Sequence, residues 1–129
     1  MCAIDSMRLE KGCGHWKSDF ITEFNPIEAG LHRFVDITKA FTGKPGLESQ
    51  TDAGSRKERV MLEIQSDKGP AQPGEGVFVA GASIGVITSA AWGYRTGTNL
   101  AMAYVDPSCA EPGTEVEVLL IGDTTRATV

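Results

Sequence analysis

Residues 77–105, VFVAGASIGVITSAAWGYRTGTNLAMAYV, decide the fold class of this chain. Val77–Val79 and Ser83–Ala90 are runs of β-branched and small side chains, and Gly81 between them suits a tight hairpin turn. A second glycine-containing loop leads into the strongly apolar stretch Asn99–Val105. Strands joined by such short loops predict an antiparallel sheet.

Further strand patterns lie on both sides of this stretch. Residues 60–65 alternate between core-type and more polar side chains, residues 116–120 repeat the alternation, and a turn leads into 125–129. Strands about ten residues apart are typical of a small barrel or sandwich. Strict alternation would also place Ile84, Val86 and Thr88 on one face of their strand, opposite Gly85, Ile87 and Ser89.

The first quarter of the chain has a different character. Residues 5–31 read DSMRLEKGCGHWKSDFITEFNPIEAGL. Asp5 is a good N-cap, strong helix formers follow it, and Gly12 can take the positive φ that ends a helix. After a polar and aromatic loop, Pro26 suits the first position of a short turn that Gly30 stops. We therefore expect a mainly β (α+β) protein, in which a helix and a loop-rich segment precede a small antiparallel β-barrel of five to six strands.

The region between these two parts is predicted from weaker patterns. Residues 31–37 are expected to be extended, and residues 47–50 to form a short helix. Residues 51–59 are polar and charged, with a glycine that breaks any periodicity, so they are predicted to be a solvated linker.

The composition of the chain indicates which partners it can bind and in which cellular compartment it works. The 129 residues carry a net charge of −5, and the basic residues are scattered among acidic ones, which argues against a nucleic-acid surface. No apolar run approaches the roughly 20 residues of a membrane span, and no secretory signal is visible. Three irregularly spaced cysteines form no disulfide framework. We expect a cytoplasmic protein that binds neither nucleic acid nor membrane.

Several motifs occur in an order that is specific in combination. They are SMRLEKG at 6–12, HW at 15–16, NPIEAGL at 25–31, FTGK at 41–44, GVITS at 85–89 and LAMAYV at 100–105. This order resembles the C-terminal half of the folate-binding aminomethyltransferase family, which comprises the glycine-cleavage T-protein and the fused C-terminal portion of dimethylglycine and sarcosine dehydrogenases. The resemblance covers essentially the whole chain.

Single positions indicate the branch of that family. T-proteins typically have arginine before the aspartate that matches Asp5, whereas this chain has Ile4, so it is placed nearer the dimethylglycine/sarcosine dehydrogenase branch. Two departures stand in the following loop. Cys13 replaces a tyrosine that is usual in the dehydrogenase branch, and Lys17 replaces a usual glycine.

The resemblance implies a division of the chain and a set of partners. Residues 1–33 would end a preceding folate-binding domain, and residues 34–129 would form the C-terminal barrel domain. Because both ends look cut, we expect a fragment whose partners are the missing N-terminal domains, of the same or a neighbouring chain. Tetrahydrofolate is the implied cofactor, and FAD would belong only to a missing N-terminal region.

The resemblance also implies candidate pocket residues, with a plainer interpretation for each. Arg8, Glu10 and Trp16 would line the folate pocket, because a guanidinium suits a carboxylate and an indole can form a wall for the pterin. Arg8 and Glu10 could equally be surface charges, and Trp16 a packing anchor. Pro26, Glu28 and Gly30 are expected to build a structural turn.

The sequence lacks the motifs that would indicate a flavin site, a catalytic triad or a zinc site. No G-x-G-x-x-G motif, no supported Ser/His/Asp set and no regular zinc spacing is present, so neither a catalytic residue nor a metal site is expected. Two functions follow. The first is a fragment that helps to close the folate pocket of an enzyme transferring one-carbon units from glycine, dimethylglycine or sarcosine type amines. The alternative is a non-catalytic barrel for interaction or oligomerisation, with a possible homodimer through the N-terminal segment.

Overall fold

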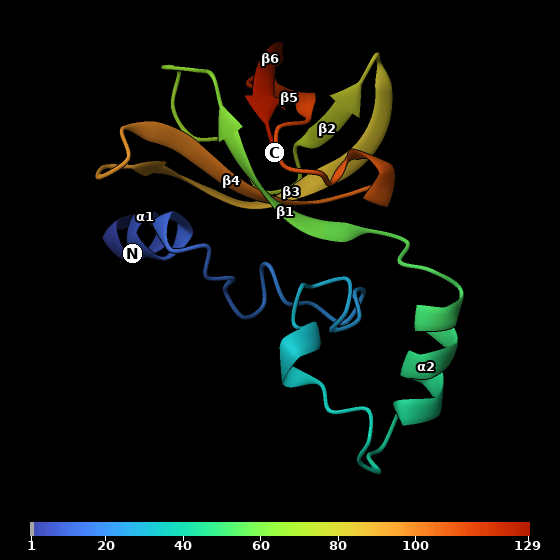
Figure 1. Cartoon of the computed structure of the whole chain (residues 1–129). Helices are drawn as coiled ribbons and strands as arrows, with labels where there is room; N and C mark the ends of the chain where they lie inside the picture. The colour runs from blue at the N-terminus through green and yellow to red at the C-terminus, as the bar shows by residue number, and fades with distance from the viewer. Residues whose placement is uncertain (1) are drawn as a thin grey trace.

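The computed structural model describes residues 2–129 (Figure 1). Three helical segments and six strands carry the regular structure, together with a short 3₁₀ helix before the last hairpin. In chain order they are α1 (Cys2–Glu10), η1 (His32–Phe34), α2 (Lys44–Asp52), β1 (Glu58–Ile64), β2 (Gly76–Val79), β3 (Ala82–Gly93), β4 (Thr98–Val105), η2 (Pro107–Cys109), β5 (Glu115–Leu120) and β6 (Asp123–Thr128).

The six strands form a closed antiparallel barrel, which confirms the predicted fold class. Their order around the barrel is β1-β4-β3-β2-β5-β6, and β6 closes it by pairing with β1, where Glu63 lies opposite Thr128. Closure leaves no free sheet edge, which is how small barrels avoid unwanted strand pairing.

The barrel interior is filled by the alternating side chains that the sequence pattern indicated. In β1 the side chains of Val60, Leu62 and Ile64 are buried, and in β5 those of Val116 and Val118 are buried in the same way. A period of two therefore sets the core of these strands.

Strand β3 departs from strict alternation, so the predicted pattern of faces was wrong there. Ile87 lies opposite Ala103 but Ser89 lies opposite Met102, which leaves Thr88 as an extra residue in a β-bulge. A second irregularity lies opposite β2, where Val77 faces Gly85 but Phe78 faces Ser83, so Ile84 is also an extra residue. Ile84 and Ile87 consequently both belong to the core. The bulge also brings two neighbouring hydroxyl groups, those of Thr88 and Ser89, to the same external carboxylate.

The first helix ends as predicted but begins earlier. Because α1 starts at Cys2, Asp5 lies inside the helix and is not its N-cap. At the other end Gly12 has φ +68°, and the N–H groups of Gly12 and Cys13 bond the carbonyls of Leu9 and Arg8, each at 2.8 Å. These two bonds define a Schellman motif, the arrangement that glycine favours at a helix end.

Three other boundaries differ from the sequence expectation. The segment expected to be extended contains the 3₁₀ turn η1, and α2 begins at Lys44 because Pro45 is tolerated in a first helical turn. Strand β3 continues through Trp92 and Gly93, which were expected in a loop, since β4 goes on pairing with both.

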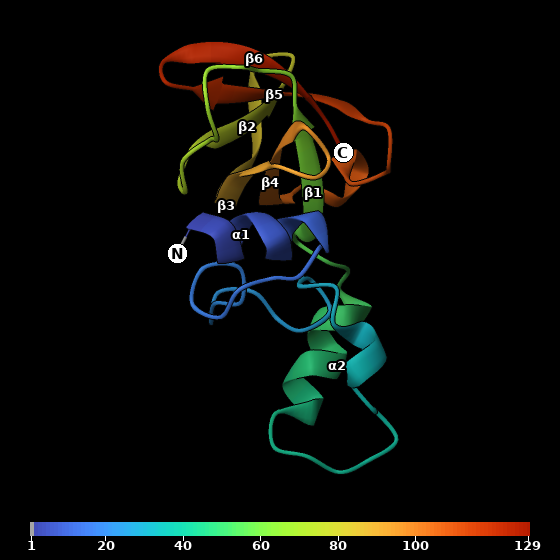
Figure 2. The same cartoon turned by 90° about the vertical axis from the view of Figure 1, so that its left-hand side faces the viewer.

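The N-terminal part forms a layer against one side of the barrel. Figures 1 and 2 both show α1 and the chain that follows it lying along β3 and β4, whereas α2 stands away from the barrel. None of the α2 residues is buried. We call residues 2–31 the N-terminal layer. Within residues 2–129, no helix is both long and apolar enough to cross a membrane.

Candidate functional site

Helix α1 is tied to the hairpin between β3 and β4 by polar contacts at two points. The Ser6 hydroxyl donates to the Trp92 carbonyl at 2.7 Å. One turn further, Oε1 of Glu10 accepts from the backbone N–H groups of Arg95 and Thr96, at 2.6 and 3.0 Å. The Glu10 carboxylate therefore caps the hairpin loop and orients the helix on the barrel.

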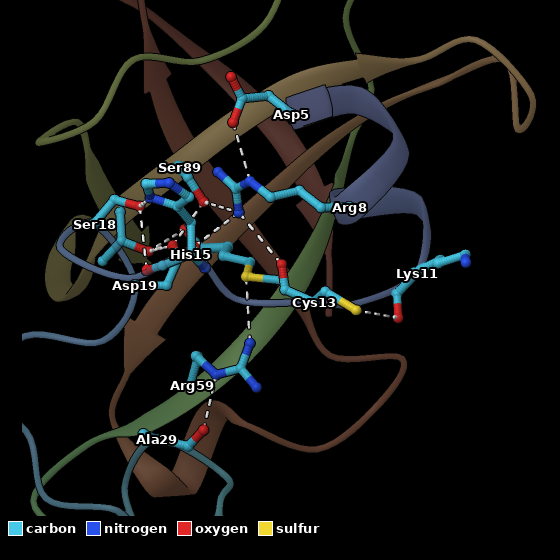
Figure 3. Close-up of polar contacts among 12 residues, drawn as sticks. Asp5, Arg8, Lys11, Cys13, His15, Ser18, Asp19, Ala29, Arg59 and Ser89 are labelled. Atoms are coloured by element: carbon cyan, nitrogen blue, oxygen red, sulfur yellow. Dashed lines mark hydrogen bonds and ion pairs between the residues drawn. The ribbon is translucent and has the colours of Figure 1, made fainter. Parts of the chain in front are cut away.

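Arg8 lies between two carboxylates rather than in an open cavity (Figure 3). Its Nε is 3.0 Å from Oδ1 of Asp5, its Nη1 is 2.8 Å from Oδ2 of Asp19, and its side chain is only 12% exposed. The same Nη1 also approaches the Ser89 hydroxyl at 3.4 Å. Charge-assisted bonds of this kind hold a guanidinium in one orientation.

Asp19 is the centre of this cluster and is fully buried. Oδ2 accepts from Arg8 and from the backbone N–H of His15 at 2.7 Å, while Oδ1 accepts from the hydroxyls of Thr88 and Ser89, the latter at 2.6 Å. Burial pushes the pKa of this carboxyl upward. The bonds from Ser89, Thr88 and His15, together with the Arg8 charge, outweigh that effect and hold the pKa below its ordinary value.

The backbone of Asp19 is bonded to the barrel as well. Its carbonyl accepts from the hydroxyl of Tyr104 in β4 at 2.7 Å. The ring of Phe24 stacks on Tyr104 with centroids 3.6 Å apart and planes 10° from parallel. Burial raises the pKa of Tyr104 to about 12. Neither the depth of Asp19 nor its link to Tyr104 could be read from the sequence, although the GVITS motif contained both hydroxyl donors.

Trp16 lies at a different place from the charged cluster. Its side chain is 71% exposed and lines a largely apolar hollow of about 530 Å³ together with Phe20, Phe24 and Leu31. Glu10 lines a separate hollow at the β3–β4 hairpin. The structure therefore does not bring Arg8, Glu10 and Trp16 together in one cavity of this chain.

The Pro26-to-Gly30 turn is held by reciprocal bonds. The side chain of Asn25 accepts from the Glu28 N–H at 2.9 Å, and Glu28 Oε2 accepts from the Asn25 N–H at 2.9 Å, as in a capping box. Glu28 is buried and pairs with Arg56 at 3.1 Å. Burial opposes ionisation, but the bonds from Arg56 and Asn25 hold the pKa of Glu28 below its ordinary value. Gly30 has φ +70°.

Metal ligands do not gather in the described part of the chain. Among residues 2–129, no group of three or more His, Cys, Asp or Glu side chains is placed to hold a metal ion. Cys13 and Cys109 are free thiols.

Comparison with known proteins identifies the family. Residues 57–129, more than half of the chain, match the model of the glycine cleavage T-protein C-terminal barrel domain. The chain belongs to this family. The match agrees with the resemblance drawn from the motifs, and it coincides with the six-stranded barrel and the segment entering β1.

Individual relatives extend the similarity of the barrel domain to the N-terminal layer. The chain is 36% identical to mitochondrial dimethylglycine dehydrogenase of Rattus norvegicus, over 98% of this chain and 15% of that protein. It is 38% identical to the aminomethyltransferase of Moorella thermoacetica, over 98% of this chain and 35% of the relative. Relatives of both branches are therefore similar to it, and the chain spans only about a sixth to a third of their lengths.

A solved structure shows the same arrangement of elements. The glycine cleavage system aminomethyltransferase T from Bartonella henselae superposes with a TM-score of 0.91 at 32% identity, covering 98% of this chain and 36% of that one. The superposition includes nearly the whole chain. The N-terminal layer therefore lies on the barrel in the same way in this relative.

Proposed function

We propose that the chain is the C-terminal part of a tetrahydrofolate-dependent aminomethyltransferase-like protein, in which it helps to close the folate pocket and supplies no catalytic group. The observation that carries this proposal is the agreement with a T-protein over 98% of this chain but only 36% of the other. The remaining residues of the pocket, including those that perform chemistry, would then lie in parts of the family's chain that these residues do not include.

The surface of the N-terminal layer supports a role in an incomplete pocket. Ile4, Met7 and Trp16 expose 69%, 63% and 71% of their surface, which is a large apolar exposure for one short segment. A neighbouring domain would cover such side chains, and Trp16 with the aromatic hollow beside it offers a flat wall to a pterin ring.

The residues present fit one side of a folate site but not a whole site. A folate carboxylate at Arg8 would compete with Asp5 and Asp19, which already neutralise the guanidinium. Glu10 is bonded to the hairpin loop. We therefore assign Trp16 to the pocket wall directly, and Arg8 and Glu10 to it through the helix that they hold in place. When bound, tetrahydrofolate would accept the one-carbon unit of a glycine, dimethylglycine or sarcosine type amine.

Calorimetry with tetrahydrofolate tests this proposal on the chain as it is. An incomplete pocket predicts millimolar affinity or none. A micromolar dissociation constant would show that the chain contains a complete site and would overturn the proposal. Trp16→Ala is the matched variant, because any weak binding at the proposed wall should be abolished by it.

A second candidate function rests on the same exposed side chains. If Ile4, Met7 and Trp16 meet a second copy of the chain, the domain is a non-catalytic oligomerisation module. Size-exclusion chromatography with light scattering separates the two. A stable dimer that Met7→Lys converts to a monomer favours the module, and a monomer at all concentrations favours the pocket-closing part. We also propose a cytoplasmic location, on the cysteine pattern alone.

A further inference from the structure

One buried carboxylate gathers hydrogen-bond donors from both the N-terminal layer and the barrel. The two oxygens of Asp19 receive donors from three parts of the chain: Arg8 in α1, the His15 N–H in the loop, and Thr88 and Ser89 in β3. A buried carboxylate with four donors is fully satisfied, whereas a variant that removes it takes one acceptor away from each of those donors.

The backbone of the same residue makes a second connection. The Tyr104 hydroxyl donates to the Asp19 carbonyl, and the stacked ring of Phe24 covers Tyr104 from the loop side. Tyr104 has no exposed surface. Asp19 therefore joins helix, loop and two barrel strands within a single residue, and the exposure of Tyr104 reports whether the layer is in place.

We propose that Asp19 is the positioning residue of the N-terminal layer: its carboxylate fixes α1 and the Trp16 loop on the barrel without help from any other domain. The meaning of that position for a folate pocket rests on the function proposed above. The positioning by Asp19 does not rest on that function, because Asp19 and all of its donors belong to residues 2–129. In the whole protein, Asp19 would set the place of the pocket wall while touching no ligand.

The other buried carboxylate of the layer provides the matched control. Glu28 is also buried, but its partner Arg56 is 63% exposed and lies just before β1. Glu28 therefore holds the Pro26-to-Gly30 turn and has no contact with α1. Removing its charge with Glu28→Gln should leave the helix and Tyr104 in place.

The test uses full-length variants and two measurements that involve no ligand. Tyr94→Phe is the background, since it leaves Tyr104 as the one tyrosine of the chain. In Asp19→Ala, we expect hydrogen exchange of the α1 amides to accelerate at least tenfold more than exchange of the barrel strands. Ultraviolet titration should show the Tyr104 pKa falling from about 12 toward 10. Asp19, Glu28 and Arg59 all place a charge near Tyr104, so Asp19→Asn, which removes the same charge as Asp19→Ala, corrects for the electrostatic part of the shift.

The conservative variant separates positioning from general destabilisation. Asp19→Asn keeps the shape and an acceptor for Arg8, so it should retain much of the α1 protection that Asp19→Ala loses. Exchange that rises equally in α1 and in every strand, or protection of α1 unchanged in Asp19→Ala, would overturn the inference. Neither measurement depends on folate, so a failure of folate binding would count against the proposed function alone.

Discussion

Nη1 of Arg8 lies 2.8 Å from Oδ2 of Asp19, and this ion pair joins the first helix to a carboxylate that has no exposed surface. The pair is fixed from the other side by Ser89 and Thr88 at the bulge of β3. A charge buried on its own is costly, so the pair can persist only because every oxygen of Asp19 has a donor.

Asp19→Ala should therefore destabilise the protein strongly. It removes one partner of a buried pair and takes an acceptor from Arg8, Thr88 and Ser89, which predicts a loss of about 3 kcal/mol in the free energy of unfolding at pH 7. Urea denaturation followed by circular dichroism measures it. Asp36→Asn, at a carboxylate on the surface of the η1–α2 loop, is the control and should leave the midpoint unchanged. A loss in Asp19→Ala no larger than in the control would refute the role of the pair.

The same carboxylate predicts a pH dependence with a definite sign. Because the pKa of Asp19 is lowered in the folded state, its contribution to stability is complete above the unfolded pKa of about 3.9 and disappears as the pH falls through the folded pKa. The charged group that faces it is Arg8 from α1; the loop, β3 and β4 present neutral donors. The stability difference between the wild type and Asp19→Asn should thus be constant from pH 7 to 5 and shrink toward pH 3. A difference that grows on acidification would contradict this assignment.

Lys17 offers a test of backbone strain in the Trp16 loop. Its φ is +75°, a left-handed conformation that costs a side chain roughly 1 kcal/mol. Lys17→Gly should stabilise the protein by about 0.5 kcal/mol, because the relieved strain exceeds the added entropy of the unfolded chain. Lys11→Gly, at a position without positive φ, should give no gain in the melting temperature. Equal effects of both variants would argue against strain.

Gly85 of β3 lies tightly against the backbone of β4. A Cβ atom at this position would overlap the backbone oxygen of Tyr104, which cannot move without breaking the sheet. Gly85→Ala should cost about 3 kcal/mol or more and loosen Tyr104. Gly46→Ala in α2 is the control, since nothing lies within 4 Å of the added atom there and alanine favours a helix. Equal melting temperatures of the two variants would contradict the pairing of β3 with β4 described above.

The sequence predicted the strands of the barrel but not the bulge in β3 or the burial of Asp19. The alternation around Leu62 and Val118 predicted the barrel, because a half-buried strand repeats every two residues. The Thr88 bulge left no such signal, and one extra residue was enough to reverse the faces beyond it. Asp19 lies in the stretch that was predicted only as a polar and aromatic loop, since nothing in a single sequence shows which donors will converge on a carboxylate from 69 and 70 residues away.

The start of the first helix shows a similar limit. Asp5 has the chemistry of an N-cap, but the helix continues past it to Cys2 and the carboxylate bonds Arg8 instead. Local propensity cannot decide between a cap and an ion pair, because the barrel surface on which the helix packs is built by strands more than eighty residues later in the chain.

Native-state hydrogen exchange of the wild type tests most directly the claim that layer and barrel form one body. In increasing low concentrations of urea, the amides of Arg8, Leu9 and Glu10 should open with the same free energy as those of β3 and β4, because both depend on Asp19. Exchange of the α1 amides at rates close to those of an unstructured peptide, while the strands stay protected, would contradict it.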